Sequence, residues 1–137
     1  MADTIFLEIV TPDRMLVSEE VKDICAPGIE GEFGVLPEHT PFLSILKSGL
    51  ISFKTLQNEV KYLNVSWGYA EVRSDRVIIL AEAAERPEEI DLDRAMSAKK
   101  RAEDRLSKGS EDIDIERAQL ALARALARID IASKYIK

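Results

Sequence analysis

Apolar residues follow two different periods along the 137 residues of the chain. Over the first 86 residues, β-branched and aromatic side chains recur in short segments that turn residues separate, which is typical of strands. Short strands without intervening helices predict an antiparallel sandwich or flattened barrel. We predict seven strands, at Ile5–Val10, Val21–Ala26, Phe42–Leu46, Leu50–Leu56, Val60–Ser66, Tyr69–Arg73 and Arg76–Glu82.

The period changes after Arg86, where Pro87 and two acidic residues precede a long segment without proline. Asp91 stands where a helix N-cap is expected, and a run without glycine or proline extends from it to Ser107. A break at residues 108–110 separates this helix from a second one, which starts near Asp112 or Asp114 and ends near Tyr135. The chain is therefore predicted to be an α+β protein, with an N-terminal antiparallel β-sandwich over residues 1–86 and a C-terminal antiparallel two-helix hairpin over residues 87–137.

Each predicted helix has an alanine-rich apolar side and a separate arginine stripe, which on the second helix lies roughly opposite the apolar one. The arginines either form a solvated face, paired with nearby acids, or bind phosphates or an acidic patch on a protein. The residues alone leave these alternatives open. The apolar positions are Leu92, Ala95, Ala102 and Leu106 on the first helix and Ile115, Ala118, Leu122, Ala125, Ile129, Ala132 and Ile136 on the second, and the arginines are Arg94, Arg101, Arg105, Arg117, Arg124 and Arg128.

Charge and composition narrow the classes of function. The chain has 25 acidic and 19 basic residues, a net charge of −6 that disfavours a nucleic-acid partner. One cysteine and one histidine make neither an internal disulfide nor a Cys/His zinc site, and a carboxylate site for Mg²⁺ or Ca²⁺ stays open without EF-hand spacing. No apolar run approaches the length of a membrane helix, and no phosphate-binding or hydrolase motif is present, so an enzyme is disfavoured.

Several segments resemble one known family along the whole chain. The segment Gly31–Leu43, GEFGVLPEHTPFL, resembles a loop and strand of the epsilon subunit of bacterial F-type ATP synthase, which is the delta subunit in mitochondria. The start, IFLEIVTPD at Ile5–Asp13, and the later segments Gly68–Val72 and Ile90–Ala95 are similar to the same family. The resemblance implies about ten strands, with further short ones around residues 14–17 and 33–36.

The resemblance implies a non-catalytic subunit of the central stalk. Such a subunit couples rotation between the membrane c-ring and the catalytic head, and its movable hairpin inhibits ATP hydrolysis. Its implied partners are the gamma subunit, the c-ring and the alpha and beta subunits. Its implied place is the peripheral, cytoplasmic face of the bacterial inner membrane, without insertion into the lipid. No cofactor is required, and ATP is a candidate regulatory ligand.

The resemblance also implies roles for particular residues. The c-ring and gamma interface falls on Glu32, Phe33 and His39, although a loop histidine can also be purely structural. In some bacterial members an I/L-D-x-x-R-A motif binds ATP, and its matching positions here are Glu85, Ile90, Asp91, Arg94, Arg101, Arg124 and Arg128. With the hairpin extended, the beta subunit would meet Arg117, Arg124, Arg128 and Lys134.

Some of these residues can also have purely structural roles, and other functions compete with that of a rotor subunit. Asp91 can be an N-cap alone, and Arg94 can belong to a surface ion pair. A free-standing small ATP-binding sensor is the alternative to a rotor subunit. An enzyme with its site in the sandwich is disfavoured, because the sequence shows no spacing of nucleophile and base there.

Overall fold

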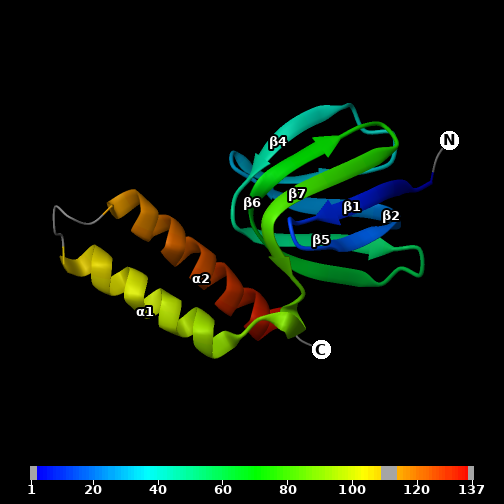
Figure 1. Ribbon diagram of the computed structural model, residues 1–137. Coiled ribbons are helices and arrows are strands. Elements are labelled where there is room, and N and C mark those ends of the chain that lie inside the picture. The colour runs from blue at the N-terminus through cyan, green and yellow to red at the C-terminus, as the bar shows by residue number, and fades with distance from the viewer. Residues whose placement is uncertain (1–2, 109–113, 136–137) are drawn as a thin grey trace. The chain divides into compact units, whose positions relative to one another are not determined.

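The computed structural model describes residues 3–108 and 114–135 of the chain. The chain divides into two compact units, Met1–Arg86 and Pro87–Lys137 (Figure 1). The first unit is built of strands and the second of helices. The strands are β1 (Ile5–Val10), β2 (Met15–Gly28), β3 (Gly31–Val35), β4 (Phe42–Leu46), β5 (Gly49–Thr55), β6 (Val60–Val72) and β7 (Arg76–Glu85).

Two of the strands are longer than the sequence pattern predicts. The predicted strands Val60–Ser66 and Tyr69–Arg73 are a single strand, β6, and the predicted strand Val21–Ala26 is the second half of β2. The first half of β2 and all of β3 cover the two regions where the family resemblance adds short strands. The described residues thus contain seven strands, and continuous strands replace the shorter pieces that the resemblance implies.

The sheet closes on itself through these long strands. β6 pairs with β5 through its first half, with β4 through its second half and with β7 along most of its length. β2 pairs in turn with β1, β5 and β3. All pairs are antiparallel except β1 with β7, which run parallel from Phe6 opposite Arg76 to Val10 opposite Leu80. The sequence pattern predicts no parallel pair, because alternation carries no information about strand direction.

The core of the first unit lies inside this closed sheet. In β1, Ile5, Leu7 and Ile9 are fully buried while the residues between them are partly exposed. The inward residues of β6 and β7, such as Leu63, Val65 and Ile79, complete the same cluster. Alternation with a period of two is therefore what directs one face of each strand inward.

β6 bends in its middle, at Trp67 and Gly68. Trp67 has a positive φ of 57° and Gly68 one of 156°, a combination of backbone angles that strongly favours glycine at the second position. A Cβ atom on Gly68 would lie 2.1 Å from the carbonyl oxygen of Leu80 on β7. The glycine therefore permits close contact between the two backbones.

The second unit contains a short 3-10 turn, η1 (Pro87–Glu89), and the helices α1 (Leu92–Lys108) and α2 (Ile115–Tyr135). Asp91 begins α1, since its Oδ1 accepts a hydrogen bond from the backbone N–H of Arg94 at 3.1 Å. Asp114 begins α2 in the same way, with 3.0 Å to the N–H of Arg117. The alternative start at Asp112 and the predicted break around Gly109 lie outside the described residues. Neither described helix combines the length and apolar character needed to span a lipid bilayer.

Alanines form the contact between the two helices. Ala95 and Ala102 of α1 are buried, as are three alanines of α2 spaced by seven residues, Ala118, Ala125 and Ala132. Small side chains at this spacing allow two helix backbones to approach closely. Most of the predicted apolar stripes are therefore confirmed.

Two details of the helix faces differ from the prediction. Leu92 and Ile115, the first residues of the two helices, are exposed, because a helix end has fewer neighbours to cover it. Ile131 is buried although it lies outside the predicted stripe. Ile136, the last residue predicted for the stripe, lies outside the described residues.

The bend in β6 makes a testable prediction about stability. We expect Gly68→Ala to lower the free energy of unfolding by about 3 kcal/mol or more, because the new methyl group would overlap the backbone of β7. Chemical denaturation of the full chain measures this change. Gly34→Ala is the matched control, since its Cβ would meet atoms no closer than 3.8 Å, and we expect a change below about 1 kcal/mol. Equal effects of the two substitutions would contradict this account.

Candidate functional site

Three aromatic rings gather where β4 begins. The rings of Phe33 and Phe42 meet edge to face with centroids 5.2 Å apart, and the ring of His39 meets Phe42 at 5.3 Å. His39 Nδ1 lies 2.8 Å from the carbonyl oxygen of Thr40, which orients the imidazole. Of the predicted interface residues, Phe33 and His39 thus join through Phe42, which the sequence analysis did not single out.

The loop that carries His39 is held by backbone hydrogen bonds. The N–H of His39 donates to the carbonyl of Leu36, and the N–H of Glu38 donates to Ser74 at 2.9 Å. Glu38 has a φ of 65°, which turns the chain sharply before His39. Glu32 lies at the exposed start of β3, opposite Pro27 of β2. The predicted interface residues therefore stand on a well-bonded hairpin and turn.

Next to this cluster, the outer face of β4, β6 and β7 exposes a continuous apolar surface. Ile45 is paired with Tyr69, and Tyr69 is paired with Leu80, so the three side chains lie side by side on one face. They are 46%, 54% and 53% exposed, and Leu43, two residues before Ile45, is 70% exposed. We call these four residues the apolar row. Such a contiguous exposed patch is typical of a protein–protein contact.

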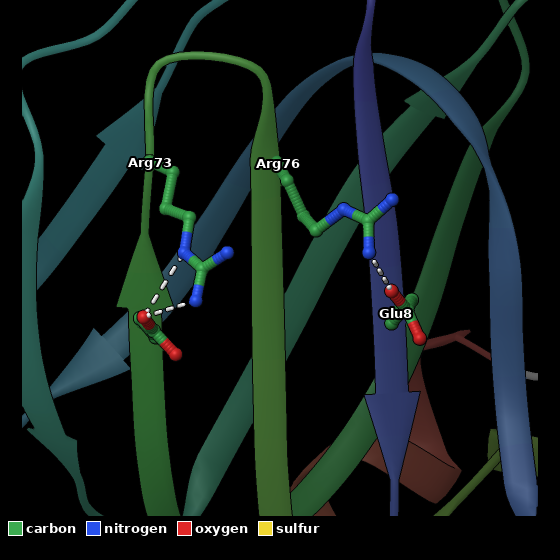
Figure 2. A network of polar contacts seen from close by, with 4 residues as sticks. Glu8, Arg73 and Arg76 are labelled. Atoms are coloured by element: carbon green, nitrogen blue, oxygen red, sulfur yellow. Dashed lines mark hydrogen bonds and ion pairs between the residues drawn. The ribbon is translucent and has the colours of Figure 1, made fainter.

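Two polar pairs lie beyond one end of the apolar row in the strand registers. Figure 2 shows their side chains, with Arg76 and Glu8 joined by a dashed line. Arg73 donates two hydrogen bonds to Glu71 Oε1, at 3.0 and 2.8 Å. Arg76 donates to Glu8 Oε1 at 3.1 Å, and its guanidinium lies 5.1 Å from the centre of the Phe6 ring. These residues continue the same outer face of β6, β7 and β1 by the strand registers. A polar rim beside an apolar centre is the usual arrangement of such contacts.

Glu85, a predicted nucleotide contact, ends β7 in the first unit. The buried amide of Asn64 donates to Glu85 Oε1 at 2.9 Å, and the two residues are direct neighbours across β6 and β7. Asn64 Oδ1 is buried without a hydrogen-bond partner among the described residues. The Glu85 carboxylate is thus held in a defined orientation by the sheet.

The other predicted nucleotide contacts lie in the helical unit. Asp91 and Ile90 precede α1, and Arg94 stands in its first turn. Arg101 is exposed further along α1, whereas Arg124 and Arg128 on α2 are half-buried. The sequence analysis expected these two arginines to lie opposite the contact between the helices. Their half-burial shows instead that they flank this contact.

Five arginines of the hairpin form no ion pair with the acidic side chains that the structure describes. Among the described residues, no carboxylate lies within salt-bridge distance of the guanidinium groups of Arg94, Arg101, Arg105, Arg117 and Arg124. The aspartates that begin the helices, Asp91 and Asp114, bind backbone N–H groups. The described residues thus supply no ion pairs for these five arginines, and the alternatives of a solvated face and of an anion-binding face both stay open.

Lys134, a predicted contact of the beta subunit, has a partner in its own helix. Its Nζ lies 2.9 Å from Asp130 Oδ1 one turn earlier. The hydrogen bond and negative charge of Asp130 raise the pKa of Lys134 above its ordinary value. Both side chains are well exposed, so the pair contributes little to stability.

The apolar row is absent from the residues predicted from the sequence. The sequence of β4, FLSIL, could have indicated it, because this strand is apolar on both faces. A strand of this kind is covered on both sides, by its own core and by something else. Among residues 3–108 and 114–135, no group of three or more His, Cys, Asp or Glu side chains is arranged to hold a metal ion.

Comparison with known proteins covers both units. The family model described as the beta-sandwich domain of the ATP synthase Delta/Epsilon chain matches residues 4–87. The model described as the long alpha-helix domain of the same chain matches residues 88–133. The matched ranges meet where the two compact units meet.

Relatives and solved structures agree with these matches. An ATP synthase epsilon chain of Nitratidesulfovibrio vulgaris is 52% identical over 131 residues, 96% of this chain and 97% of the relative. One of Koribacter versatilis is 56% identical over 77% of this chain and 74% of its own length.

In a mitochondrial ATP synthase structure of Euglena gracilis, containing OSCP, F1 and the c-ring, one chain superposes with a TM-score of 0.83. It is 26% identical, and the match covers 93% of this chain and 80% of that one. A chain of the central stalk and c-ring of Tetrahymena thermophila shares the fold, with a TM-score of 0.61 at 14% identity, over 95% of this chain and 94% of that one. The chain belongs to the delta/epsilon chain family of ATP synthase.

Proposed function

We propose that the chain is a non-catalytic rotor subunit of the central stalk of a bacterial F-type ATP synthase. It couples rotation between the c-ring and the catalytic head, and it does no bond chemistry itself. The observation that carries this proposal is the apolar row beside the aromatic cluster of the first unit, because two neighbouring surfaces suit a subunit held between partners. Membership of the family and the likeness to a chain of an F1/c-ring structure support it.

The two surfaces suit different partners. The apolar row is flat and made of strand residues, so it suits a long apolar contact with the gamma subunit. Glu32 on β3 is an exposed polar residue and His39 lies in the loop before β4, so this end of the sheet suits the polar end of the c-ring. Strand β4 carries one surface and begins beside the other, which would fix the angle between the two partners. The subunit would then be peripheral at the cytoplasmic face of the membrane, held there by other proteins.

The hairpin is the proposed regulatory part. Extended, it would inhibit ATP hydrolysis, with Arg117, Arg124, Arg128 and Lys134 facing an acidic segment of the beta subunit. Folded down, it would bind ATP, with arginines of both helices on the phosphates and Asp91 and Glu85 on the sugar or base. A ligand that binds one state favours that state by mass action, so ATP would relieve inhibition.

A free-standing ATP sensor is the second candidate function. The five arginines that have no acidic partner among residues 3–108 and 114–135 favour it, because they offer anion binding that needs no assembly. The two candidates differ in whether the chain forms a complex. Co-purification with its gamma subunit supports the rotor, and its absence supports the sensor.

The apolar row predicts which substitution breaks the complex. We expect Ile45→Asp to weaken binding of the gamma subunit at least about tenfold, since a carboxylate would be buried in an apolar contact. Leu56→Asp is the matched control, because Leu56 is 45% exposed against 46% for Ile45 but lies in the turn after β5. Interferometry with immobilised gamma measures both. If the control weakens binding as much as Ile45→Asp does, the apolar row is not the contact.

Two substitutions of Asp91 distinguish its role as a helix cap from its proposed role in binding ATP. Asparagine caps a helix as well as aspartate does, so we expect Asp91→Asn to keep the helix but to remove a charged contact with ATP. Asp91→Ala should lose the contact and about 1 kcal/mol of stability as well. Calorimetric titration of the full chain with ATP, with and without Mg²⁺, measures binding, and Arg94→Ala should abolish the heat. Absence of heat for the unaltered chain at millimolar ATP would refute ATP binding.

Arg124 and Arg128 should serve both states of the hairpin. Replacing both by alanine is expected to reduce ATP binding by the chain and also its inhibition of ATP hydrolysis in the reconstituted enzyme. Inhibition that rests on charge pairing should also weaken as salt is raised. Lys100→Ala, an exposed charge on α1, serves as the control. Retention of both ATP binding and inhibition in the double variant would contradict the shared role.

A further inference from the structure

The two helices are copies of one sequence pattern. Residues 91–106 aligned with residues 114–129, an offset of 23, are identical at seven of 16 positions. Three further positions exchange leucine for isoleucine or aspartate for glutamate. The shared pattern is D-(L/I)-(D/E)-R-A-x-x-A-x-x-R-A-x-x-R-(L/I), so every arginine stripe residue of one helix has a counterpart on the other.

The structure repeats the same equivalence. Asp91 and Asp114 cap their helices through the same two hydrogen bonds, to the N–H groups three and four residues later. Ala95 and Ala118 are both buried at the helix contact, as are Ala102 and Ala125. Two equivalent helices packed antiparallel through equivalent residues are related by an approximate twofold axis. The hairpin therefore has two equivalent ends.

This symmetry places six arginines on one face. The arginines of each helix fall within about 40° of one another, on the same flank of its alanine stripe. An axis perpendicular to the plane of the two helices keeps equivalent flanks on the same side, so both stripes share one face. We call this the arginine face; its members are Arg94, Arg101 and Arg105 of α1 and Arg117, Arg124 and Arg128 of α2.

Antiparallel packing arranges the arginine face in three levels. The level of each arginine is its distance in residues from the end of α1 or from the start of α2. In the first level, Arg105 is three residues before the end of α1 and Arg117 is two residues after the start of α2. Arg101 and Arg124 form the second level, at seven and nine residues, and Arg94 and Arg128 form the third, at 14 and 13 residues. The face thus runs for about 16 Å along the hairpin at 1.5 Å per residue. ATP, as proposed above, would occupy two of its three levels.

The other side of the hairpin is different in chemistry. The exposed large apolar residues of the two helices, Leu92, Met96, Ile115 and Leu126, fall on the opposite flanks of the alanine stripes. A protein partner needs an apolar anchor, and that side supplies it. The arginine face has guanidinium groups but none of these exposed apolar residues, so it suits a slender, highly charged anion better than a protein surface.

We propose that the arginine face is a continuous binding site for a linear polyphosphate, with Arg105 and Arg117 forming a second phosphate-binding end. The central pair, Arg101 and Arg124, serves both ends. A chain of phosphates long enough to reach all three levels engages six guanidinium groups, whereas ATP engages four. The central pair rests on the ATP site proposed above, while the second end uses residues that site does not include.

Competitive titration of the full chain tests the second end. We expect long-chain inorganic polyphosphate to bind at least about tenfold more tightly than tripolyphosphate, because more guanidinium groups are engaged. Arg105→Gln with Arg117→Gln should remove most of this difference and leave the affinity for ATP within about twofold. Circular dichroism melting verifies that the variant stays folded.

A charge-matched control separates a site from diffuse attraction. Lys99→Gln with Lys100→Gln removes the same charge from α1 outside the arginine face, and it should leave polyphosphate affinity within about twofold. An equal loss in this control, or equal binding of polyglutamate, would overturn the proposal. If ATP fails to bind but the dependence on Arg105 and Arg117 holds, the ATP sensor is wrong and the polyphosphate site stands. If ATP binds but replacing Arg105 and Arg117 does not change polyphosphate affinity, the ATP site stands and the polyphosphate site is wrong.

Discussion

Strand β6 pairs with β5 through Val60–Val65, with β4 through Gly68–Val72 and with β7 through Asn64–Val72. One strand can serve three neighbours because β5 and β4 follow each other along one edge of β6 in the same register, while β7 takes the other edge. At Gly68 the absence of a side chain allows the backbone of β6 to approach β7 closely. The closed sheet, and with it the enclosed core, depends on these pairings of β6.

Closure of the sheet also determines what the protein presents outward. Inward residues of β4, β6 and β7 fill the core, so the alternate residues Ile45, Tyr69 and Leu80 are placed together on the outside. The same strand, β4, begins beside the cluster of Phe33, His39 and Phe42. A rigid sheet therefore holds two candidate contact surfaces at a fixed separation, which is what the proposed role between two partners requires.

In the helical unit, the contact between small side chains has the corresponding role. Alanines at seven-residue spacing bring α1 and α2 close together, and the positions flanking them, including Arg124 and Arg128, become half-buried. Duplication of the pattern then collects arginines from both helices on one face. The aspartates at the helix starts bind backbone N–H groups rather than these guanidinium groups. The core and the arginine face of this unit come from one repeated pattern.

The sequence by itself predicted much of this architecture. The switch from a period of two to a helical period near Pro87 marks the change of unit, and Asp91 and Asp114 at the predicted helix starts are caps in the structure. These features are local, so nearby residues are enough to reveal them. The family could likewise be identified from the segment Gly31–Leu43 and its order along the chain.

The tertiary structure decided what depends on partners distant in sequence. Alternation along β6 does not reveal that its two halves form one strand, nor does it indicate that β1 runs parallel to β7. The helical stripe does not include Ile131, which packing buries, and the apolar row exists only after three strands are in register. Periodicity reports which residues share a face of one element, but only packing determines what lies against that face.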